Sequence, residues 1–246
     1  MAELVELGDG ALTVYTQSTL EAQYIYDEIF EQGCYDTLRL PEKPLVFDIG
    51  GNIGMFALYI KNRYPDAEVV SFEPMPESVE LFHRNVALHG LDDVTLHTKA
   101  LGSERESDVS FSFFPMLPAN STRYPEIKEL PKAQMAEKVD QALVDQIYYA
   151  RNVTADVERL AGFLPEDRDV DLLKVDVEGA EADVLLGVDA SQWPRVRRAV
   201  VEVADLDGQL ERVCDILRTA GFDVTPERAP LTEEENHYYM VHAERP

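Results

Sequence analysis

The stretch DIGGNIG at residues 48–54 follows the apolar run PLVF and precedes MFALYI. A short run that is apolar on both sides is typical of a buried parallel strand, and the apolar stretch after the glycines is typical of a buried helix. Glycines this close together between a strand and a helix bring the backbone against a negatively charged or nucleotide-like ligand. The stretch therefore predicts a nucleotide-cofactor turn within an α/β sheet.

The spacing of the glycines separates two classes of cofactor. A dinucleotide turn needs G-x-G-x-x-G, and no choice of starting glycine gives that order here. The order fits D-x-G-x-N-x-G instead, which resembles the first motif of class I methyltransferases that use S-adenosylmethionine (SAM). The matching residues are Asp48, Gly50, Asn52 and Gly54. We therefore expect SAM as the cofactor, and an NAD-dependent oxidoreductase is the disfavoured alternative.

A carboxylate follows at the end of the next predicted strand, AEVVSFE, as Glu73. A carboxylate at that position can accept hydrogen bonds from both ribose hydroxyls, because it extends from the carboxyl end of the strand beside the glycine turn. SAM and NAD enzymes share this device, so Glu73 supports a nucleoside site without choosing between the two cofactors.

The charge of the whole chain excludes several classes of partner. Its 246 residues allow one sizeable domain, and 22 Lys plus Arg against 47 Asp plus Glu give a formal net charge of −25. Such a surface repels phosphate backbones and anionic lipids, so we expect no nucleic-acid and no membrane partner. The acidic first ten residues lack the features of a signal peptide, and no stretch is long enough to span a bilayer. We expect a cytoplasmic protein.

From residue 45 the pattern alternates between strands and helices, which indicates a mostly parallel sheet with helices on both faces. The expected strands lie at 45–49, 67–73, 93–101, 170–177, 197–204, 221–225 and 237–244. No helix separates the last two, so they must pair antiparallel if they are neighbours. A reversed strand at the C-terminus is typical of class I methyltransferases, so the expected fold is an α/β, Rossmann-like methyltransferase sheet.

Two segments lie outside this alternation. Residues 1–40 form an N-terminal extension with a helix that begins at Ser18 or Thr19, which we expect to lie over the core as a lid or as ordinary packing. Within the methyltransferase domain, 41–246, the stretch at about 115–150 begins with a Pro-rich part and continues with a helix over 132–150. An insertion at the edge of an α/β sheet often shapes a substrate pocket.

Three longer segments resemble the FkbM family of SAM-dependent methyltransferases. They are VFDIGGNIGMFALYI, FEPMPESVELFHRNVALHG and DLLKVDVEGAEADVLLG. The resemblance covers roughly residues 40–205, and KVDVEGAE is its most specific part. YIYDEIFEQGCYD and FFPMLPANSTRYP are also similar to a subgroup from polyketide and nonribosomal peptide pathways. The resemblance implies O-methylation of a hydroxyl on a secondary metabolite or a sugar.

The resemblance also implies where the cofactor is held. It assigns the four residues of the glycine-turn motif to the methionine side of SAM and Glu73 to the ribose. Ala100 and Leu101, in TKALGS, follow the third predicted strand, where the family contacts the adenine.

Methyl transfer needs alignment of the reacting atoms and a group that takes the acceptor's proton. Asp176 lies at the end of the fourth strand of the core, so we expect it to be nearest the reacting atoms, and the alternative is simple pairing with Lys174. Glu202 is the second catalytic candidate, because a carboxylate on a buried strand is costly unless it is paired or functional. We expect Glu178 and Glu181 to lie at a helix start. Acids on different strands give no diagnostic metal spacing, so we expect no metal.

The expected acceptor is a hydroxylated small molecule, either free or tethered to a carrier protein. WPRVRR is the compact basic cluster that such a carrier could contact, although a solvated edge is the favoured interpretation of Arg195, Arg197 and Arg198. A noncatalytic SAM-binding or scaffold subunit is the alternative function, and the intact acids of the motifs argue against it. The sequence leaves the oligomeric state open.

Overall fold

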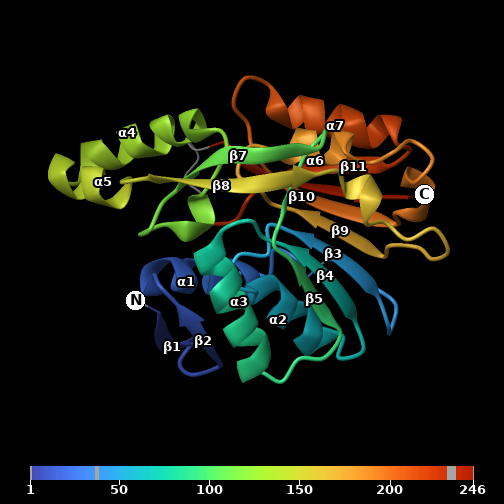
Figure 1. Cartoon of the computed structure of the whole chain (residues 1–246), viewed down its shortest axis with the longest axis horizontal. Helices are drawn as coiled ribbons and strands as arrows, with labels where there is room; N and C mark the ends of the chain where they lie inside the picture. The colour runs from blue at the N-terminus through green and yellow to red at the C-terminus, as the bar shows by residue number, and fades with distance from the viewer. Residues whose placement is uncertain (1, 37–38, 232–236, 246) are drawn as a thin grey trace.

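The computed structural model describes residues 2–36, 39–231 and 237–245. Its centre is a seven-stranded sheet in the order β11-β12-β10-β9-β3-β4-β5 (Figure 1). The strands are β3 (Leu45–Ile49), β4 (Glu68–Phe72), β5 (Val94–His97), β9 (Leu172–Val175), β10 (Arg198–Ala204), β11 (Asp223–Arg228) and β12 (Tyr238–Glu244). β12 runs antiparallel to both of its neighbours, whereas the other pairs are parallel. The predicted sheet with a reversed C-terminal strand is confirmed.

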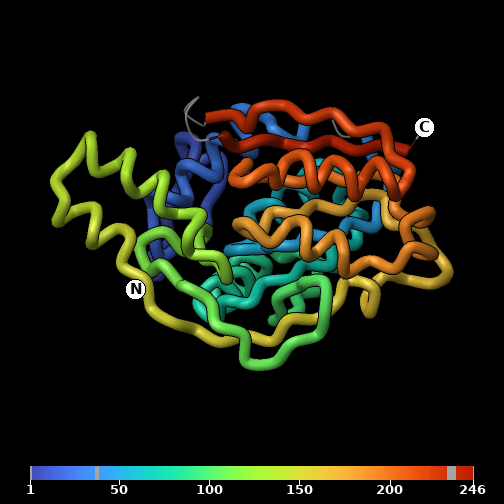
Figure 2. The backbone as a smooth tube through the Cα atoms, turned by 90° about the horizontal axis from the view of Figure 1, so that it is seen from above, coloured from blue at the N-terminus to red at the C-terminus, as the bar shows by residue number. Residues whose placement is uncertain are grey.

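Helices cover both faces of the sheet (Figures 1 and 2). α2 (Met55–Arg63) and α3 (Pro76–Leu88) lie on one face, and α6 (Glu181–Leu186) and α7 (Gln209–Thr219) lie on the other. Because side chains alternate along a strand, β3 supplies Phe47 and Ile49 to the α6–α7 side of the core and Val46 to the α2 side. This two-sided burial explains why the central strands are apolar throughout.

The N-terminal extension contains more than the expected helix. α1 (Thr19–Tyr26) begins where the sequence predicts, with Ser18 as its N-cap, and continues as the π-helical turn η1 (Asp27–Glu31). Before it, β1 (Glu3–Leu7) and β2 (Leu12–Thr16) form an antiparallel hairpin that the sequence analysis missed. The signal was present, since Gly-Asp-Gly separates two runs rich in apolar residues. Residues 37–38 lie outside the described part.

The region after β5 builds a second, three-stranded sheet in the order β6-β8-β7. Its strands are β6 (Ala100–Leu101), β7 (Glu106–Phe113) and β8 (Arg151–Glu158). The strand predicted over 93–101 is therefore two strands in different sheets. β8 was missed although Val153, Ala155 and Val157 alternate with polar residues, and its partner β7 is remote in the sequence.

Between β7 and β8 the chain folds into two short 3₁₀ turns and two helices that project from the body (Figure 1). These are η2 (Pro118–Asn120), η3 (Pro125–Lys128), α4 (Glu129–Lys138) and α5 (Gln141–Ile147). The single helix expected over 132–150 is broken at Val139, and the Asp140 carboxylate caps α5 by accepting from Ala142 N. Further 3₁₀ turns are η4 (Leu160–Gly162) and η5 (Trp193–Arg195).

The length and hydropathy of a helix determine whether it can cross a membrane. Among the described residues, every helix is too short or too polar to traverse a lipid bilayer.

Candidate active site

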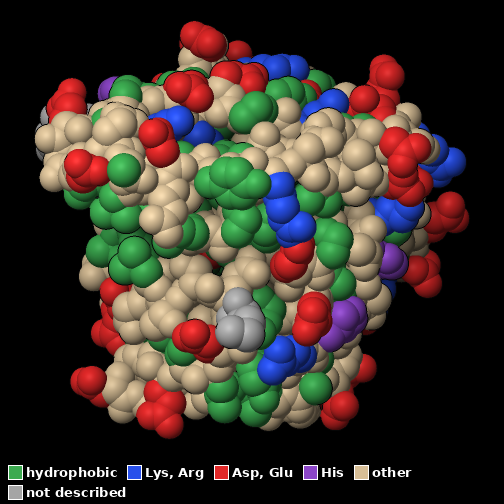
Figure 3. All heavy atoms as spheres, turned by 60° about the vertical axis from the view of Figure 1, so that its left-hand side comes forward, with side chains coloured by type: hydrophobic (Ala, Val, Ile, Leu, Met, Phe, Trp, Pro, Cys, Tyr) green, Lys and Arg blue, Asp and Glu red, His purple; other side chains and the backbone are tan. Residues whose placement is uncertain are grey.

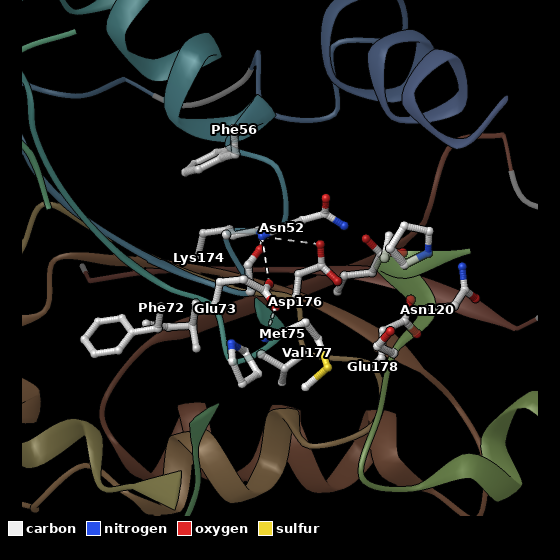
Figure 4. Close-up of a pocket in the computed structure, with 18 of the residues that line it drawn as sticks. Asn52, Phe56, Phe72, Glu73, Met75, Asn120, Lys174, Asp176, Val177 and Glu178 are labelled. Atoms are coloured by element: carbon white, nitrogen blue, oxygen red, sulfur yellow. Dashed lines mark hydrogen bonds and ion pairs between the residues drawn. The ribbon is translucent and has the colours of Figure 1, made fainter. Parts of the chain in front are cut away.

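A pocket lies at the carboxyl ends of the parallel strands (Figure 4). Its floor is made by the glycine turn after β3, by Glu73 after β4, by Asp176 after β9 and by Glu202 on β10. The roof comes from outside the central sheet, namely α1, η1 and η2. Ligands of open α/β sheets bind at this edge, so the topology itself marks the pocket as the candidate site.

The glycine turn is held flush against the end of β9. Gly50 has φ +86°, and a Cβ atom there would lie 1.8 Å from the carbonyl oxygen of Asp176. The amides of Gly50 and Gly51 both donate to Phe72 O, at 3.0 and 2.9 Å. Only glycine combines the left-handed conformation with this close approach, so the motif's first glycine is required by geometry.

Two backbone amides, one from the glycine turn and one from the segment after β4, hold the Glu73 carboxylate in place. Its Oε2 accepts from Asn52 N at 2.9 Å, and its Oε1 accepts from Met75 N at 2.8 Å. Burial raises the pKa of Glu73 to about 7, although the two amides oppose this effect. Each carboxylate oxygen keeps a further lone pair for a ligand hydroxyl.

A buried charge centre lies behind the turn. Lys174 Nζ is 3.2 Å from Asp48 Oδ1 and 3.4 Å from Asp176 Oδ2, and it donates to Gly50 O at 2.7 Å (Figure 4). Asp48 is fully buried and also accepts from Ser71 Oγ at 2.9 Å. Burial alone would lower the pKa of Lys174, but the two carboxylates raise it above its usual value. The ammonium is therefore a permanent cation under the turn.

The structure brings most of the predicted site residues together at the pocket. Those that line it are Gly50, Asn52, Glu73, Ala100, Leu101, Asp176 and Glu202. Asp48 and Gly54 do not line it, and their expected place along the methionine side stays a prediction. Asp48 is turned inward to Lys174, and Gly54 packs on the Phe82 ring, so both shape the turn from behind. Asp176 pairs with Lys174, as the alternative interpretation expects, and it also lines the pocket, so its catalytic role stays a prediction.

Glu178 does not cap a helix, contrary to expectation. Its backbone is left-handed, with φ +57°, and its carboxylate lines the pocket and forms an ion pair of 2.5 Å with Lys128 of η3. Thr122 Oγ1 donates to Glu178 O at 2.6 Å. The insertion is thereby fastened to the DVEG turn. Glu181 is the helix-start residue that the sequence predicts, since its Oε1 accepts from Gly179 N at 2.7 Å.

The sequence analysis missed two acids that reach the pocket from the N-terminal extension, Glu21 and Glu28. They are seven residues apart, with Ile25 between them, which places all three on one face of a helix. Glu21 Oε1 accepts from Ala119 N of η2 at 2.9 Å, so the two parts of the roof are joined. The spacing could have identified this face, but not that it covers a pocket.

Asn85 was also missed. Its buried side chain donates to Ile53 O, in the glycine turn, at 2.8 Å and to Tyr15 O, in β2, at 3.0 Å. Its Oδ1 accepts from Tyr15 N at 2.6 Å. One side chain of α3 therefore fastens the N-terminal hairpin to the cofactor turn.

The arginine cluster lies away from the pocket. Arg197 binds Asp169, with Nε 2.9 Å from Oδ2, and Arg198 forms an ion pair with Glu244, which is what the solvated-edge interpretation predicts. Within the described ranges, no group of three His, Cys, Asp or Glu residues is placed to hold a metal ion.

The surface beside α1 and the insertion is partly apolar. Hydrophobic side chains gather between scattered acidic ones on this face (Figure 3). Leu20 is 79% exposed and Tyr149 is 62% exposed, and Tyr24 is 43% exposed while it also lines the pocket. The pocket thus communicates with a surface that suits an organic molecule.

The residues present fit SAM. One end of the pocket is apolar and suits an adenine ring, and it is lined by Phe72, Met75, Ala100, Leu101 and Phe111. Glu73 follows with lone pairs for the ribose hydroxyls, and the glycine turn leaves no side chain in the way. The acids beyond it match the positive charge of a sulfonium and an ammonium group.

Comparisons with known proteins agree with this geometry. A sequence profile of the methyltransferase FkbM domain matches residues 48–224. Methyltransferase 1 of Beauveria bassiana is 37% identical over 252 aligned residues, which cover 100% of this chain and 99% of that protein. The 31-O-demethyl-FK506 methyltransferase FkbM of Streptomyces tacrolimicus is 34% identical, over 94% of this chain and 93% of its own.

A solved structure shows the fold. The crystal structure of methyltransferase FkbM from Methylobacillus flagellatus superposes with a TM-score of 0.57 at 13% identity, and the match covers 88% of this chain but 47% of that one. The profile match spans most of the chain, and the two sequence relatives align over nearly their whole length. This chain belongs to the FkbM family of SAM-dependent methyltransferases.

Proposed function

We propose that the protein transfers a methyl group from SAM to a hydroxyl group of a small secondary metabolite, such as a polyketide, a peptide or a sugar. The observation that carries this proposal is a roofed pocket that Asp176 and Glu202 line together with the glycine turn. Carboxylates there can orient a hydroxyl and take its proton. The roof of α1 and η2 favours a small acceptor over a macromolecule.

When bound, SAM supplies a methyl group already activated on a sulfonium, which an acceptor oxygen displaces in line. The chain then has to align the acceptor, exclude water and accept one proton. Asp176 is suited to orienting, because its ion pair with Lys174 fixes the carboxylate at the end of β9. The contact between Glu21 and Ala119 closes the roof over this region.

The choice of oxygen as the acceptor atom is supported by the relative from Streptomyces tacrolimicus, whose name specifies an O-methylated product. It is tested by incubating the enzyme with labelled SAM and a panel of hydroxylated and aminated compounds. Transfer to amines alone would contradict the proposal.

Cofactor binding separates an enzyme from the other candidates. Calorimetric titration with S-adenosylhomocysteine should give micromolar affinity, about −8 kcal/mol, with no heat from NAD. Binding of S-adenosylhomocysteine without transfer to any member of the panel would favour a noncatalytic SAM-binding or scaffold subunit. Binding of NAD would contradict the family's cofactor.

Replacement of Asp176 by asparagine should leave S-adenosylhomocysteine affinity within about threefold and lower turnover by about 10²-fold, the usual loss when the reacting group is no longer correctly oriented. The amide keeps the shape of the side chain but cannot pair with Lys174. Full turnover with normal cofactor binding would remove Asp176 from the mechanism.

The pH should control cofactor affinity through Glu73. Its pKa of about 7 means that the carboxylate is largely protonated at pH 6 and ionised at pH 8. Only the ionised form accepts from the two backbone amides and two ribose hydroxyls together. S-adenosylhomocysteine should therefore bind more tightly at pH 8 than at pH 6. The Glu73→Gln variant should bind about tenfold more weakly and lose this dependence. Equal affinity of the wild type at both pH values would contradict the ribose role.

We propose a free rather than a carrier-tethered acceptor. Arg198 begins β10 and Glu202 lies near the other end of the same strand, so the arginine cluster is at the edge away from the pocket. Reversing the charge of Arg197 and Arg198 should leave turnover unchanged for free and carrier-bound acceptors alike. A selective loss with the carrier-bound form would restore the docking hypothesis.

A further inference from the structure

Glu28 lies on the face of the N-terminal helix that is turned into the pocket. Glu21, Tyr24 and Glu28 follow one another at intervals of three and four residues, and all three line the cavity. Glu28 belongs to the π-helical turn η1, a rare conformation that is concentrated at functional sites. It enters from the roof, whereas Asp176 and Glu202 belong to strands of the floor.

The carboxylates of the pocket differ in whether other groups of the protein form hydrogen bonds or ion pairs with them. Four of the six that line the pocket accept a hydrogen bond from backbone or pair with a lysine: Glu21, Glu73, Asp176 and Glu178. Within the part of the chain that the structure describes, the side-chain carboxylates of Glu28 and Glu202 form neither a hydrogen bond nor an ion pair. Both are partly buried at the pocket wall, so their free oxygens face the space that an acceptor would occupy.

Two unpaired carboxylates in one enclosed space do not both ionise. Burial, and then the charge of Asp176, raises the pKa of Glu28 to about 8. Burial, followed by Asp176 and Glu28, holds the pKa of Glu202 well above its usual range. At neutral pH both carboxyls are therefore largely protonated, and Glu28 becomes an ionised proton acceptor as the pH rises toward 8.

Among the described residues, the other titratable groups that face Glu28 and Glu202 include one cation, Lys174. These groups are Tyr24, Cys34, Tyr35, Lys174, Asp176, Glu178 and Tyr238. Burial raises the pKa of the three tyrosines and of the Cys34 thiol, so these groups stay protonated and neutral. The charge of Lys174 is already shared by Asp48 and Asp176.

Resting on the proposed hydroxyl acceptor, we propose that Glu28 is a further catalytic residue, which with Glu202 forms the proton acceptor of the reaction. As the acceptor oxygen forms its bond to the methyl carbon, the carbon–sulfur bond breaks and its electrons stay on sulfur. The hydroxyl proton passes to the ionised carboxylate of the pair and later leaves to solvent. Asp176, held by Lys174, orients the hydroxyl.

The variants Glu28→Gln and Glu202→Gln test this proposal, with Glu211→Gln on the exposed surface of α7 as the matched control. The first readout is titration of ¹³C-labelled glutamate carboxyls by NMR in the complex with S-adenosylhomocysteine. The wild type and the control should show two carboxyls that titrate near pH 8, those of Glu21 and Glu28, and one of these two signals should be absent from Glu28→Gln. In Glu202→Gln, Glu28 should still titrate near pH 8, because the protonated Glu202 that is replaced carries no charge at that pH.

The second readout is cofactor affinity, and it separates catalysis from cofactor binding. Both pair variants should bind S-adenosylhomocysteine within about threefold of the wild type. A loss of more than tenfold would make Glu28 a cofactor ligand and overturn the proposal, as would unchanged titration in Glu28→Gln.

The third readout is the pH profile of methyl transfer to the acceptor that the panel identifies. Turnover by Glu28→Gln should fall by about 10²-fold at pH 7 and lose the rise that the wild type shows as the pair ionises. Wild-type turnover and profile in this variant would overturn the proposal. Failure of the proposed function itself is distinct, because it leaves the wild type without transfer to any hydroxyl.

Discussion

Replacement of Gly50 by alanine should lower the affinity for S-adenosylhomocysteine by at least about 100-fold. The new methyl group would overlap the carbonyl oxygen of Asp176, 1.8 Å away, and that obstacle is backbone at the end of a central strand. Either the turn or the end of β9 has to move by an ångström or more, and misplacement on this scale costs about 10²-fold in a preorganised site. Calorimetric titration measures the loss.

Gly90 provides the matched control. It also has a positive φ, +58°, but a Cβ atom there would meet nothing within 4 Å. Gly90→Ala therefore carries conformational strain of about 1–3 kcal/mol without a collision, and it lies after α3, away from the pocket. It should lower thermal stability and leave cofactor affinity unchanged. Equal loss of affinity in both variants would mean that strain alone disturbs the site.

Replacement of Lys174 by methionine should lower the free energy of unfolding by about 3–5 kcal/mol, the usual cost of leaving a buried charge without its partner. The Lys174 side chain is 4% exposed and Asp48 is fully buried, so water cannot replace the lost ammonium. Domains of this kind are stable by about 5–15 kcal/mol, so the variant should unfold at a much lower urea concentration.

A double variant shows whether the uncompensated charge is the cause. Adding Asp48→Asn removes the orphaned carboxylate while it keeps an acceptor for Ser71. The double variant should recover a large part of the stability that Lys174→Met loses. If the double variant were as unstable as the single one, lost packing of the Lys174 methylene groups would be the main cause of the lower stability.

The sequence predicted the parts of this molecule that depend on short-range patterns. The glycine turn, Glu73 and Asp176 follow from strand–turn–helix order, since the carboxyl ends of parallel strands must meet at one edge of the sheet. The start of α1 at Ser18 followed from its capping chemistry.

Long-range packing explains what the sequence did not predict. Nothing in the sequence of η1 indicates that Glu28 lines the same pocket as Glu202, more than 170 positions away. The ion pair between Lys128 and Glu178 depends on how the insertion folds back and on a left-handed residue that is not glycine. The inward rotation of Asp48 depends on Lys174 from another strand.

The hydrogen bonds of Asn85 determine which residues a transferable unit of this enzyme must contain. The family profile begins at residue 48, yet the wall behind the cofactor turn includes backbone of residue 15. A transplant cut at the start of the strand–helix core would leave the amide of Asn85 without two of its three hydrogen bonds, both of them to Tyr15. Gene fusions that keep an active enzyme should therefore include the N-terminal hairpin, because its Tyr15 supports the cofactor turn through Asn85.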